Sequence, residues 1–340
     1  TAHGPPVTAS IKTPKKNGVI VFDGVAGQRI NIGFSGATLT QGRASVYRPD
    51  GEVMAIVASP VTHYYWTAYQ PVSDAMATKF ASFSPKGGSL DLAALPSSGT
   101  YTIVINPGES YTGDVTVTVS TELTGDITPQ GAAVPIAFGR FGQNARYTFS
   151  GTTGQTVSLQ LSGVTVESGY LSILKPDGGF LGTPTSFGSQ GAVIDTQVLP
   201  ASGTYAVLID PGHVDLGHAT LALYNTPDIS GNIMINEAPV TSTLTVPGQR
   251  ARYTFNGTAG QWVNLGLTSV TTASSVVSML NPDGTTLVST TVGPSGGSLD
   301  PATMLPASGT YTIAVDPVGY NTGSMALTLT SPLIGTVSLD

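Results

Sequence analysis

Apolar and polar residues alternate with a period of two along most of this chain. Residues 115–119, 157–161 and 325–329 carry apolar side chains at every second position. This spacing is typical of a strand that buries one face and exposes the other. Turn sequences such as Pro-Asp-Gly at residues 49–51 separate these segments, and no stretch of helix length keeps a 3.6-residue period. The pattern therefore predicts an all-β fold of many short strands.

One sequence motif recurs along the chain and divides it into three copies of one module. The motif Leu-Pro-(Ser/Ala)-Ser-Gly-Thr-Tyr occupies residues 95–101, 199–205 and 305–311. Each copy has about a hundred residues, which is enough for one β-sandwich. We call the copies the first, second and third repeats and expect three tandem β-sandwich, jelly-roll-like domains in a stiff rod. Their expected bounds are residues 1–124, 125–230 and 231–334.

The third repeat illustrates the strand order that the alternation predicts. The predicted strands of the third repeat are residues 232–235, 251–256, 262–267, 276–280, 287–291, 310–316 and 324–330.

The Tyr that closes each Leu-Pro-(Ser/Ala)-Ser-Gly-Thr-Tyr motif is expected to pack in a sandwich core.

The first repeat carries an insertion. Pro49 and Leu95 are 46 positions apart, whereas Pro176 and Leu199 are only 23 apart. The insertion lies within about residues 53–88 and holds the densest aromatic stretch of the chain, and long loops of this kind are often functional. The aromatic residues could stack on sugar rings or pack against a second protein surface. We favour the interface, because few polar groups accompany the rings. The candidate residues are His63, Tyr64, Tyr65, Trp66 and Tyr69.

Composition narrows the possible partners. The net charge is −7, which disfavours nucleic acid, because phosphate binding needs clustered Lys and Arg. A mean hydropathy of +0.16 argues against disorder. There is no Cys, so the fold uses no disulfide. No apolar run reaches the length of about 18 residues that a membrane helix needs, so we expect no membrane span.

The residues around the recurring motif resemble a known family. The sequences LPASGTYAVLIDPG, starting at Leu199, and LPASGTYTIAVDPVGYNTG, starting at Leu305, are similar to pre-peptidase C-terminal-like β-sandwich modules of bacterial secreted and surface proteins. They also resemble tandem copies of such modules that flank YD-repeat proteins. The resemblance implies an extracellular or cell-surface protein with an accessory, binding or spacer role. Some relatives that bind collagen or sugar use calcium, but no residue here matches such a site.

Catalytic and metal sites find little support in the sequence. Residues 293–297 fit Gly-x-Ser-x-Gly, yet no helix follows and no His comes later in the chain, as a nucleophile elbow requires. His213 and His218 lie near Asp210 and Asp215, but their irregular spacing favours a polar turn over a metal site. Calcium at Asp195, Asp210 and Asp215 has only weak support. We therefore expect no enzyme activity and no cofactor.

The repeats do not begin and end in phase with the chain. The second repeat is preceded by Gly-Asp-Ile at residues 125–127 and the third by Gly-Asn-Ile at residues 231–233, while residues 335–340 offer an equivalent opening after the third. An exposed sheet edge can accept such a segment as an added strand. We therefore expect residues 335–340 to be a donor strand that joins copies head to tail. The candidate interface residues are Gly335, Thr336, Val337, Ser338 and Leu339.

Two functions follow from these features. The first is an extracellular structural protein that polymerises into filaments, since a head-to-tail contact does not close on itself. Its partner would be another copy of the chain. The alternative is a secreted or cell-surface binding module, with polysaccharide or a cell surface as its partner and the aromatic insertion as its site. The chain begins with Thr1 rather than Met, so we expect that a leader peptide has been removed.

Overall fold

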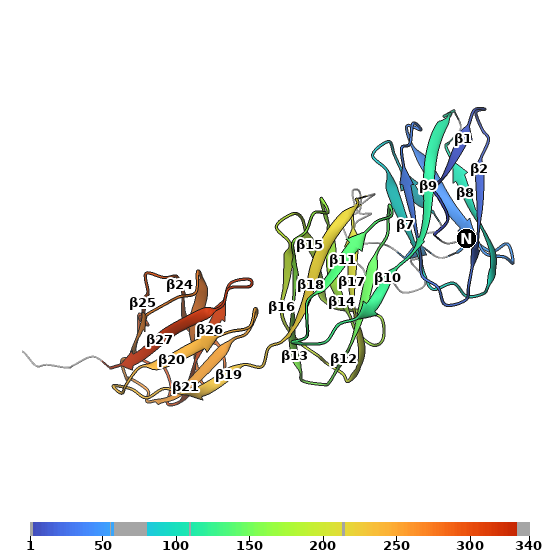
Figure 1. Cartoon of the computed structure of the whole chain (residues 1–340). Helices are drawn as coiled ribbons and strands as arrows, with labels where there is room; N and C mark the ends of the chain where they lie inside the picture. Colours follow the sequence, from blue (N-terminus) through green and yellow to red (C-terminus); the bar gives the residue numbers. More distant parts are fainter. Residues whose placement is uncertain (1–2, 55, 58–79, 109, 213–214, 332–340) are drawn as a thin grey trace, which may run out of the picture. The chain divides into compact units, whose positions relative to one another are not determined.

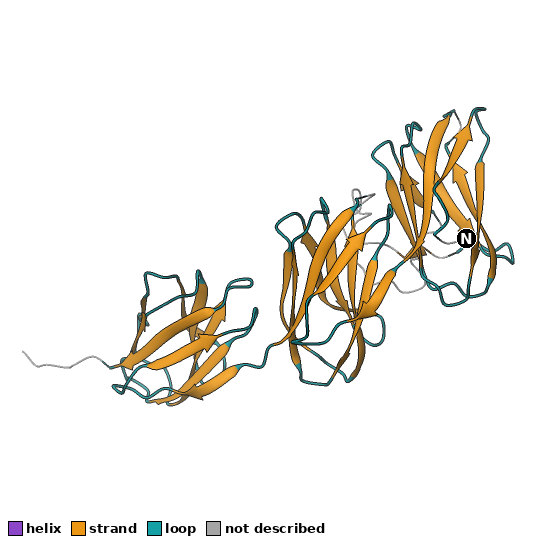
Figure 2. Ribbon diagram, viewed as in Figure 1, coloured by secondary structure: helices purple, strands orange, loops and turns teal. Residues whose placement is uncertain are grey.

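The computed structural model describes residues 3–54, 56–57, 80–108, 110–212 and 215–331. Strands and loops make up this part of the chain, and it contains no helix (Figure 2). The alternating pattern therefore predicted the fold class correctly. None of the described residues belongs to a helix that could cross a membrane.

The first repeat folds into two sheets that share one core (Figure 1). The strand orders are β1-β9-β3-β7-β5 and β2-β8-β4-β6. Ile32 of β3 and Ile103 of β8 belong to the same buried cluster, as in a β-sandwich. The bounds are β1 Val7–Ile11, β2 Gly18–Gly24, β3 Ile30–Ser35, β4 Gly42–Tyr47, β5 Ile56–Val57, β6 Ala81–Phe83, β7 Gly88–Leu92, β8 Gly99–Asn106 and β9 Gly113–Thr121.

The second repeat has sheets of the order β10-β12-β17-β14-β15 and β11-β18-β13-β16. The long strands β12 and β17 pair antiparallel over their whole shared length. The bounds are β10 Leu123–Asp126, β11 Val134–Phe138, β12 Ala145–Gly151, β13 Thr156–Ser162, β14 Gly169–Leu174, β15 Phe180–Phe187, β16 Ala192–Val198, β17 Gly203–Pro211 and β18 Gly217–Asn225.

The third repeat has sheets of the order β19-β21-β26-β23-β24 and β20-β27-β22-β25 around one core. The bounds are β19 Ile229–Asn232, β20 Val240–Leu244, β21 Ala251–Gly257, β22 Asn264–Thr268, β23 Ser275–Leu280, β24 Thr286–Val292, β25 Gly297–Leu299, β26 Gly309–Pro317 and β27 Gly323–Thr330.

Contacts between residues divide the chain into two compact units. The first comprises Thr1–Thr153, Leu161–Ile194 and Leu199–Ala222, and the second comprises Gly154–Gln160, Asp195–Val198 and Leu223–Asp340. The three domain bounds expected from the repeats therefore stay a prediction.

Most strands predicted for the third repeat are confirmed, with three corrections. The strand expected at residues 232–235 is wrong, because β19 ends at Asn232 and a turn follows it. The pattern also missed β20 and the three-residue β25. A strand that short has too few positions to show a period of two.

The Tyr of each motif is buried at the same place in its repeat. Tyr101, Tyr205 and Tyr311 are each 0% exposed. Each ring stacks on a Phe of the neighbouring strand, with centroid distances of 5.4, 5.4 and 5.3 Å. Each hydroxyl donates to the backbone carbonyl four residues earlier, at 2.7 to 2.8 Å. The hydroxyl therefore fixes the turn before the strand, as the structural interpretation of this Tyr predicts.

Tyr311→Phe tests this contact. The substitution keeps the ring but leaves the Ala307 carbonyl without its donor. We expect the free energy of unfolding of the third repeat to fall by about 1 kcal/mol in urea. Tyr320→Phe is the control, because Tyr320 is 55% exposed. An equal loss in both variants would contradict the assignment.

Candidate assembly interface

Both sites proposed from the sequence alone lie outside the described residues. The aromatic residues His63 to Tyr69 fall within residues 58–79, and the donor segment within residues 332–340. Both therefore stay predictions. The described residues do show how two earlier segments of the same kind are held, namely those that precede the second and third repeats.

The segment before the second repeat adds a strand to the sheet of that repeat. β10 pairs parallel with β12, with Leu123 opposite Ala145 and Asp126 opposite Thr148. The amide of Leu123 donates to the Asn144 carbonyl at 2.8 Å, and the amide of Ile127 donates to the Thr148 carbonyl at 2.9 Å. Ile127 is only 4% exposed. The segment is therefore held by backbone hydrogen bonds and one buried apolar side chain.

The segment before the third repeat does the same. β19 pairs parallel with β21 in the same register, with Asn232 opposite Thr254. The amide of Ile233 donates to the Thr254 carbonyl at 3.0 Å, and Ile233 is 1% exposed. The pattern aliphatic-x-Gly-Asx-Ile thus specifies a parallel edge strand. The Gly is required, because a Cβ on Gly125 would lie 2.8 Å from the Tyr147 ring.

The equivalent sheet of the first repeat has the order β2-β8-β4-β6, and no strand of the described residues covers the outer edge of β2. β2 occupies the position of β12 and β21, yet within the described residues it pairs only with β8. Val19 and Val21 stand where β12 has Arg146 and Thr148, and they are 62% and 59% exposed. A free edge with exposed β-branched side chains is a favourable acceptor for another strand.

Inside the first unit, a turn of the second repeat seats on the first repeat. Residues 140–144 join β11 to β12, and we call them the docking turn. A Cβ on Gly33 would lie 2.2 Å from the Phe141 carbonyl oxygen, and one on Gly142 would lie 2.9 Å from the Gly33 Cα. Two backbones therefore meet where neither chain has a side chain.

Polar side chains around this contact are buried and hydrogen-bonded. Asn31 Nδ2 donates to Asp91 Oδ1 at 2.7 Å, and the Asn144 amide donates to Asn31 Oδ1 at 3.1 Å. Gln143 Nε2 donates to the Thr121 carbonyl at 3.0 Å. We call Asn31, Gly33, Ser89 and Asp91 the acceptor face of the first repeat.

Burial raises the pKa of Asp91 to about 6, against the hydrogen bonds from Asn31 and Asn144, which lower it. The negative charge of Glu122 also raises the pKa of Asp91, and the positive charge of Arg146 lowers it. Arg146 forms an ion pair with Glu122 at 2.7 Å. The side chains that hydrogen-bond the Asp91 carboxylate are the neutral amides of Asn31 and Asn144. The burial of the carboxylate outweighs these bonds, so its ionisation opposes the folded state.

The second unit contains an equivalent contact with an ion pair. Gly248 approaches Ser158, whose hydroxyl donates to the Pro247 carbonyl at 2.6 Å. Arg250 stands at the position of Asn144 and pairs with Asp195 at 2.8 Å. Asp195 occupies the position of Asp91. The same turn thus uses an amide in one contact and a guanidinium in the other.

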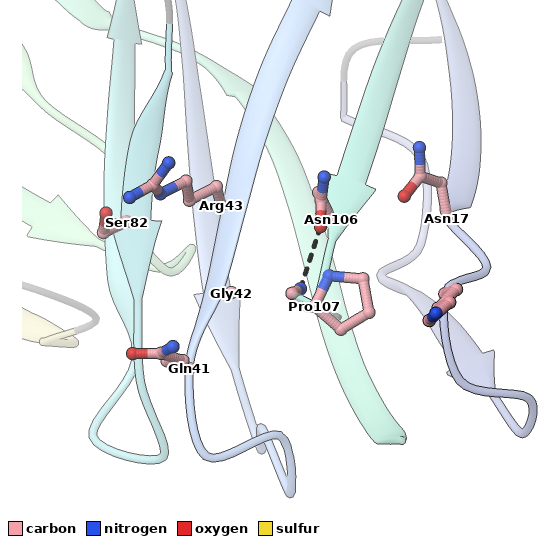
Figure 3. A pocket seen from close by; sticks show the side chains of 9 residues that line it. Asn17, Gln41, Gly42, Arg43, Ser82, Asn106 and Pro107 are labelled. Atoms are coloured by element: carbon pink, nitrogen blue, oxygen red, sulfur yellow. Dashed lines mark hydrogen bonds between the residues drawn. The ribbon is translucent and has the colours of Figure 1, made fainter. Parts of the chain in front are cut away.

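The turn of the first repeat that precedes β2, at residues 13–17, is equivalent to the docking turn. A depression of about 600 Å³ lies beside it (Figure 3). Lys15 and Asn17 line it together with Arg43 and Asn106. The Asn106 side chain accepts the Gly108 amide at 2.8 Å. The lining is polar and basic and presents no carboxylate, so it offers hydrogen-bond donors rather than a catalytic acid and base.

The described residues offer no support for the metal sites considered from the sequence. They contain no group of three or more His, Asp or Glu that could hold a metal ion. Asp195 is paired with Arg250, and Asp215 accepts the Ser168 amide at 3.2 Å. His213 lies outside the described residues.

Comparisons with known proteins give no family. No protein-family model matches the chain, and no curated protein does. Among solved structures, a periplasmic inhibitor of g-type lysozyme from Aeromonas hydrophila aligns at 15% identity over 30% of this chain and 98% of its own, with a TM-score of 0.22. The CUB1-EGF-CUB2 region of human MASP-1/3 aligns at 10% identity over 59% of this chain and all of its own, with a TM-score of 0.19. Similarities this weak carry no argument about function.

Gly33→Ala tests the close backbone contact. The added Cβ would overlap the Phe141 carbonyl, so we expect a loss of about 1 to 3 kcal/mol in the unfolding free energy of the first unit. Gly266→Ala is a matched control in the third repeat, where the nearest atom to the added Cβ is 3.8 Å away. Calorimetry of both variants checks the difference. Equal unfolding temperatures would show that the contact is not tight.

Asp91→Asn tests the buried carboxyl. The folded pKa of about 6 exceeds the reference value of 3.8, so the ionised group destabilises the fold above that range, and the penalty vanishes below a pH of about 4. We expect the variant to gain up to about 3 kcal/mol at pH 7.5 relative to its effect at pH 4, since one pKa unit is about 1.4 kcal/mol. Calorimetry at both pH values measures it. An Asp91→Asn effect that does not change with pH would refute the assignment.

Proposed function

We propose that the chain is an extracellular structural protein whose copies join head to tail into filaments by strand donation. The observation that carries this proposal is the edge of β2, which no other strand of the described residues covers, whereas β12 and β21 each have a parallel strand at the same position. The proposed donor is the segment after the third repeat of another copy. The extracellular location rests on the resemblance to secreted bacterial modules.

The donor segment is defined by its alignment with residues 121–127, which connect the first repeat to the second and which we call the first linker. Residues 331–337 align without a gap on residues 121–127, because Leu265 pairs with Leu329 as Ile32 pairs with Val119. Leu333, Gly335 and Val337 then correspond to Leu123, Gly125 and Ile127. Val337 thus puts an aliphatic residue at the position that is buried in both observed strands, and β2 offers Ile20 opposite Gly335, where β12 has Tyr147.

The remaining positions of donor and acceptor change together. In the first linker Thr124 lies opposite Arg146, and Asp126 opposite Thr148. In the proposed contact, Ile334 would lie opposite Val19 and Thr336 opposite Val21. All four residues of the proposed contact are thus β-branched, and neither strand carries a charge at these positions; cross-strand pairs of β-branched side chains stabilise a sheet. This complementarity favours a second copy as the donor.

Disulfide trapping tests the register directly, because the chain has no Cys of its own. Thr148 and Asp126 side-chain oxygens lie 2.5 Å apart, and Thr254 and Asn232 side chains 2.8 Å apart. Two variant chains, Val21→Cys and Thr336→Cys, are therefore mixed under mild oxidation. We expect a covalent dimer, which must be intermolecular since each chain carries one thiol.

The matched control moves the acceptor thiol. Asp23→Cys places it on β2 two positions beyond the expected partner of Thr336 and should cross-link weakly or not at all. Electron microscopy of the unmodified chain should show filaments, and a chain that ends at Pro332 should give folded monomers. Filaments from the truncated chain, or equal cross-linking at both thiols, would refute strand donation.

A further inference from the structure

We propose that the end of the third repeat carries a second acceptor face, formed by Asn264, Gly266, Ser298 and Asp300, which binds the turn at residues 13–17 of another copy. This interface rests on the proposed head-to-tail function but uses other residues than the donated strand. Every residue that it requires belongs to the described part of the chain.

The new face repeats the acceptor face of the first repeat residue for residue. Leu265 pairs with Leu299, and Gly266 with Ser298, as Ile32 pairs with Leu90 and Gly33 with Ser89. Extending this register by one residue past β25 sets Asn264 against Asp300, where the first repeat pairs Asn31 with Asp91. All four residues of the acceptor face are thus retained.

The second repeat differs at three of these four positions. At the positions equivalent to Asn31, Gly33, Ser89 and Asp91 it has Ser158, Gln160, Val193 and Asp195. The turn that it binds carries Arg250 rather than Asn144. The face of the third repeat therefore matches the kind of contact that takes an Asn-bearing turn.

The turn before β2 has the shape of the docking turn. The Lys16 amide donates to the Thr13 carbonyl at 3.4 Å, as the Gln143 amide donates to the Arg140 carbonyl at 3.2 Å. Lys15 has a φ of 65°, and Gly142 at the same place has a φ of 69°. Asn17 stands at the position of Asn144. A left-handed Lys is unusual, which indicates that this backbone shape is kept without Gly.

The exposure of their residues shows that no other part of the described chain covers this face or this turn. Asn31 and Asp91 are 1% and 8% exposed under the docking turn, whereas Asn264 and Asp300 are exposed. The nearest atom to a Cβ on Gly266 is 3.8 Å away, against 2.2 Å for Gly33. The open space at Gly266 is the space that Phe141 fills at Gly33.

Two further features fit the pairing. The turn carries Lys15 and Lys16, and the face carries Asp300, so their charges are complementary. The segment after the third repeat aligns on the first linker without a gap. The second linker, which connects the second repeat to the third, is two residues longer: its amides that bond the Thr156 and Arg250 carbonyls belong to Thr226 and Ile229, whereas the corresponding amides of the first linker belong to the adjacent residues Glu122 and Leu123. One difference remains: the Cβ of Lys15 requires the turn to sit slightly farther out than Gly142 does.

Gly266→Ala separates docking from folding. Its Cβ has room in the isolated chain but would overlap the Pro14 carbonyl in the docked geometry. We expect an unchanged unfolding temperature and at least a tenfold rise in the critical concentration for filaments, measured by sedimentation. An unchanged critical concentration would overturn the proposal.

A charge swap identifies the partner residues. Asn17→Asp sets two carboxylates against each other and should raise the critical concentration at least tenfold at neutral pH. Adding Asp300→Asn to the same chain should restore it to within about threefold, because an amide again faces a carboxylate. Ser97→Asp, at an exposed site beyond the opposite end of β2, is the charge control. Failure of the second substitution to rescue would overturn the pairing.

The two interfaces fail in distinguishable ways. If only docking is wrong, the Val21 and Thr336 thiols still cross-link, and Asn17→Asp leaves assembly unchanged. If only strand donation is wrong, a chain ending at Pro332 still assembles and remains sensitive to Asn17→Asp. If the unmodified chain forms no filaments, both proposals are refuted.

Discussion

In the second and third repeats, one sheet is completed by a strand that the chain supplies just before the repeat's first long strand. The first long strand of one sheet, β12 or β21, exposes an edge whose carbonyls at Asn144 and Thr148, or at Arg250 and Thr254, are bonded by the segment just before it. An unpaired buried backbone group is costly, so this edge couples a repeat to whatever precedes it. β2 has the same position and no such strand in the described chain.

The turn contacts add specificity to that edge. A strand held by backbone bonds and one buried aliphatic residue would accept many sequences, since main-chain hydrogen bonds do not distinguish side chains. The turn contacts do distinguish side chains. Gly33 leaves room only for a close backbone, and the turn brings a hydrogen-bond donor to each carboxylate, Asn144 to Asp91 and Arg250 to Asp195. Affinity and selectivity thus reside in two neighbouring surfaces with different chemistry.

The sequence alone predicted the fold class and most strands of the third repeat, because alternation and Pro-Asp-Gly turns act locally. Gly51, Gly178 and Gly284 of those turns have φ values of 84° to 85°, as the turn chemistry requires. It misplaced the strand at β19, because the apolar residues after Asn232 resemble a strand more closely than the segment 229–232 does. Residues 229–232 form a strand because they pair with β21, and a local sequence pattern does not reveal such a distant partner.

The acceptor face was missed for a related reason. Asn31 and Asp91 are far apart in sequence and look like ordinary polar residues until β3 and β7 bring them together. A signal was present nonetheless: the first and third repeats share Asn-x-Gly at residues 31–33 and 264–266, and the second does not. Within a single repeat, Asn-x-Gly does not indicate a contact with another part of the chain. Only a structure in which one copy is covered and the other exposed shows that an identical set of residues can be a buried contact in one place and an open surface in another.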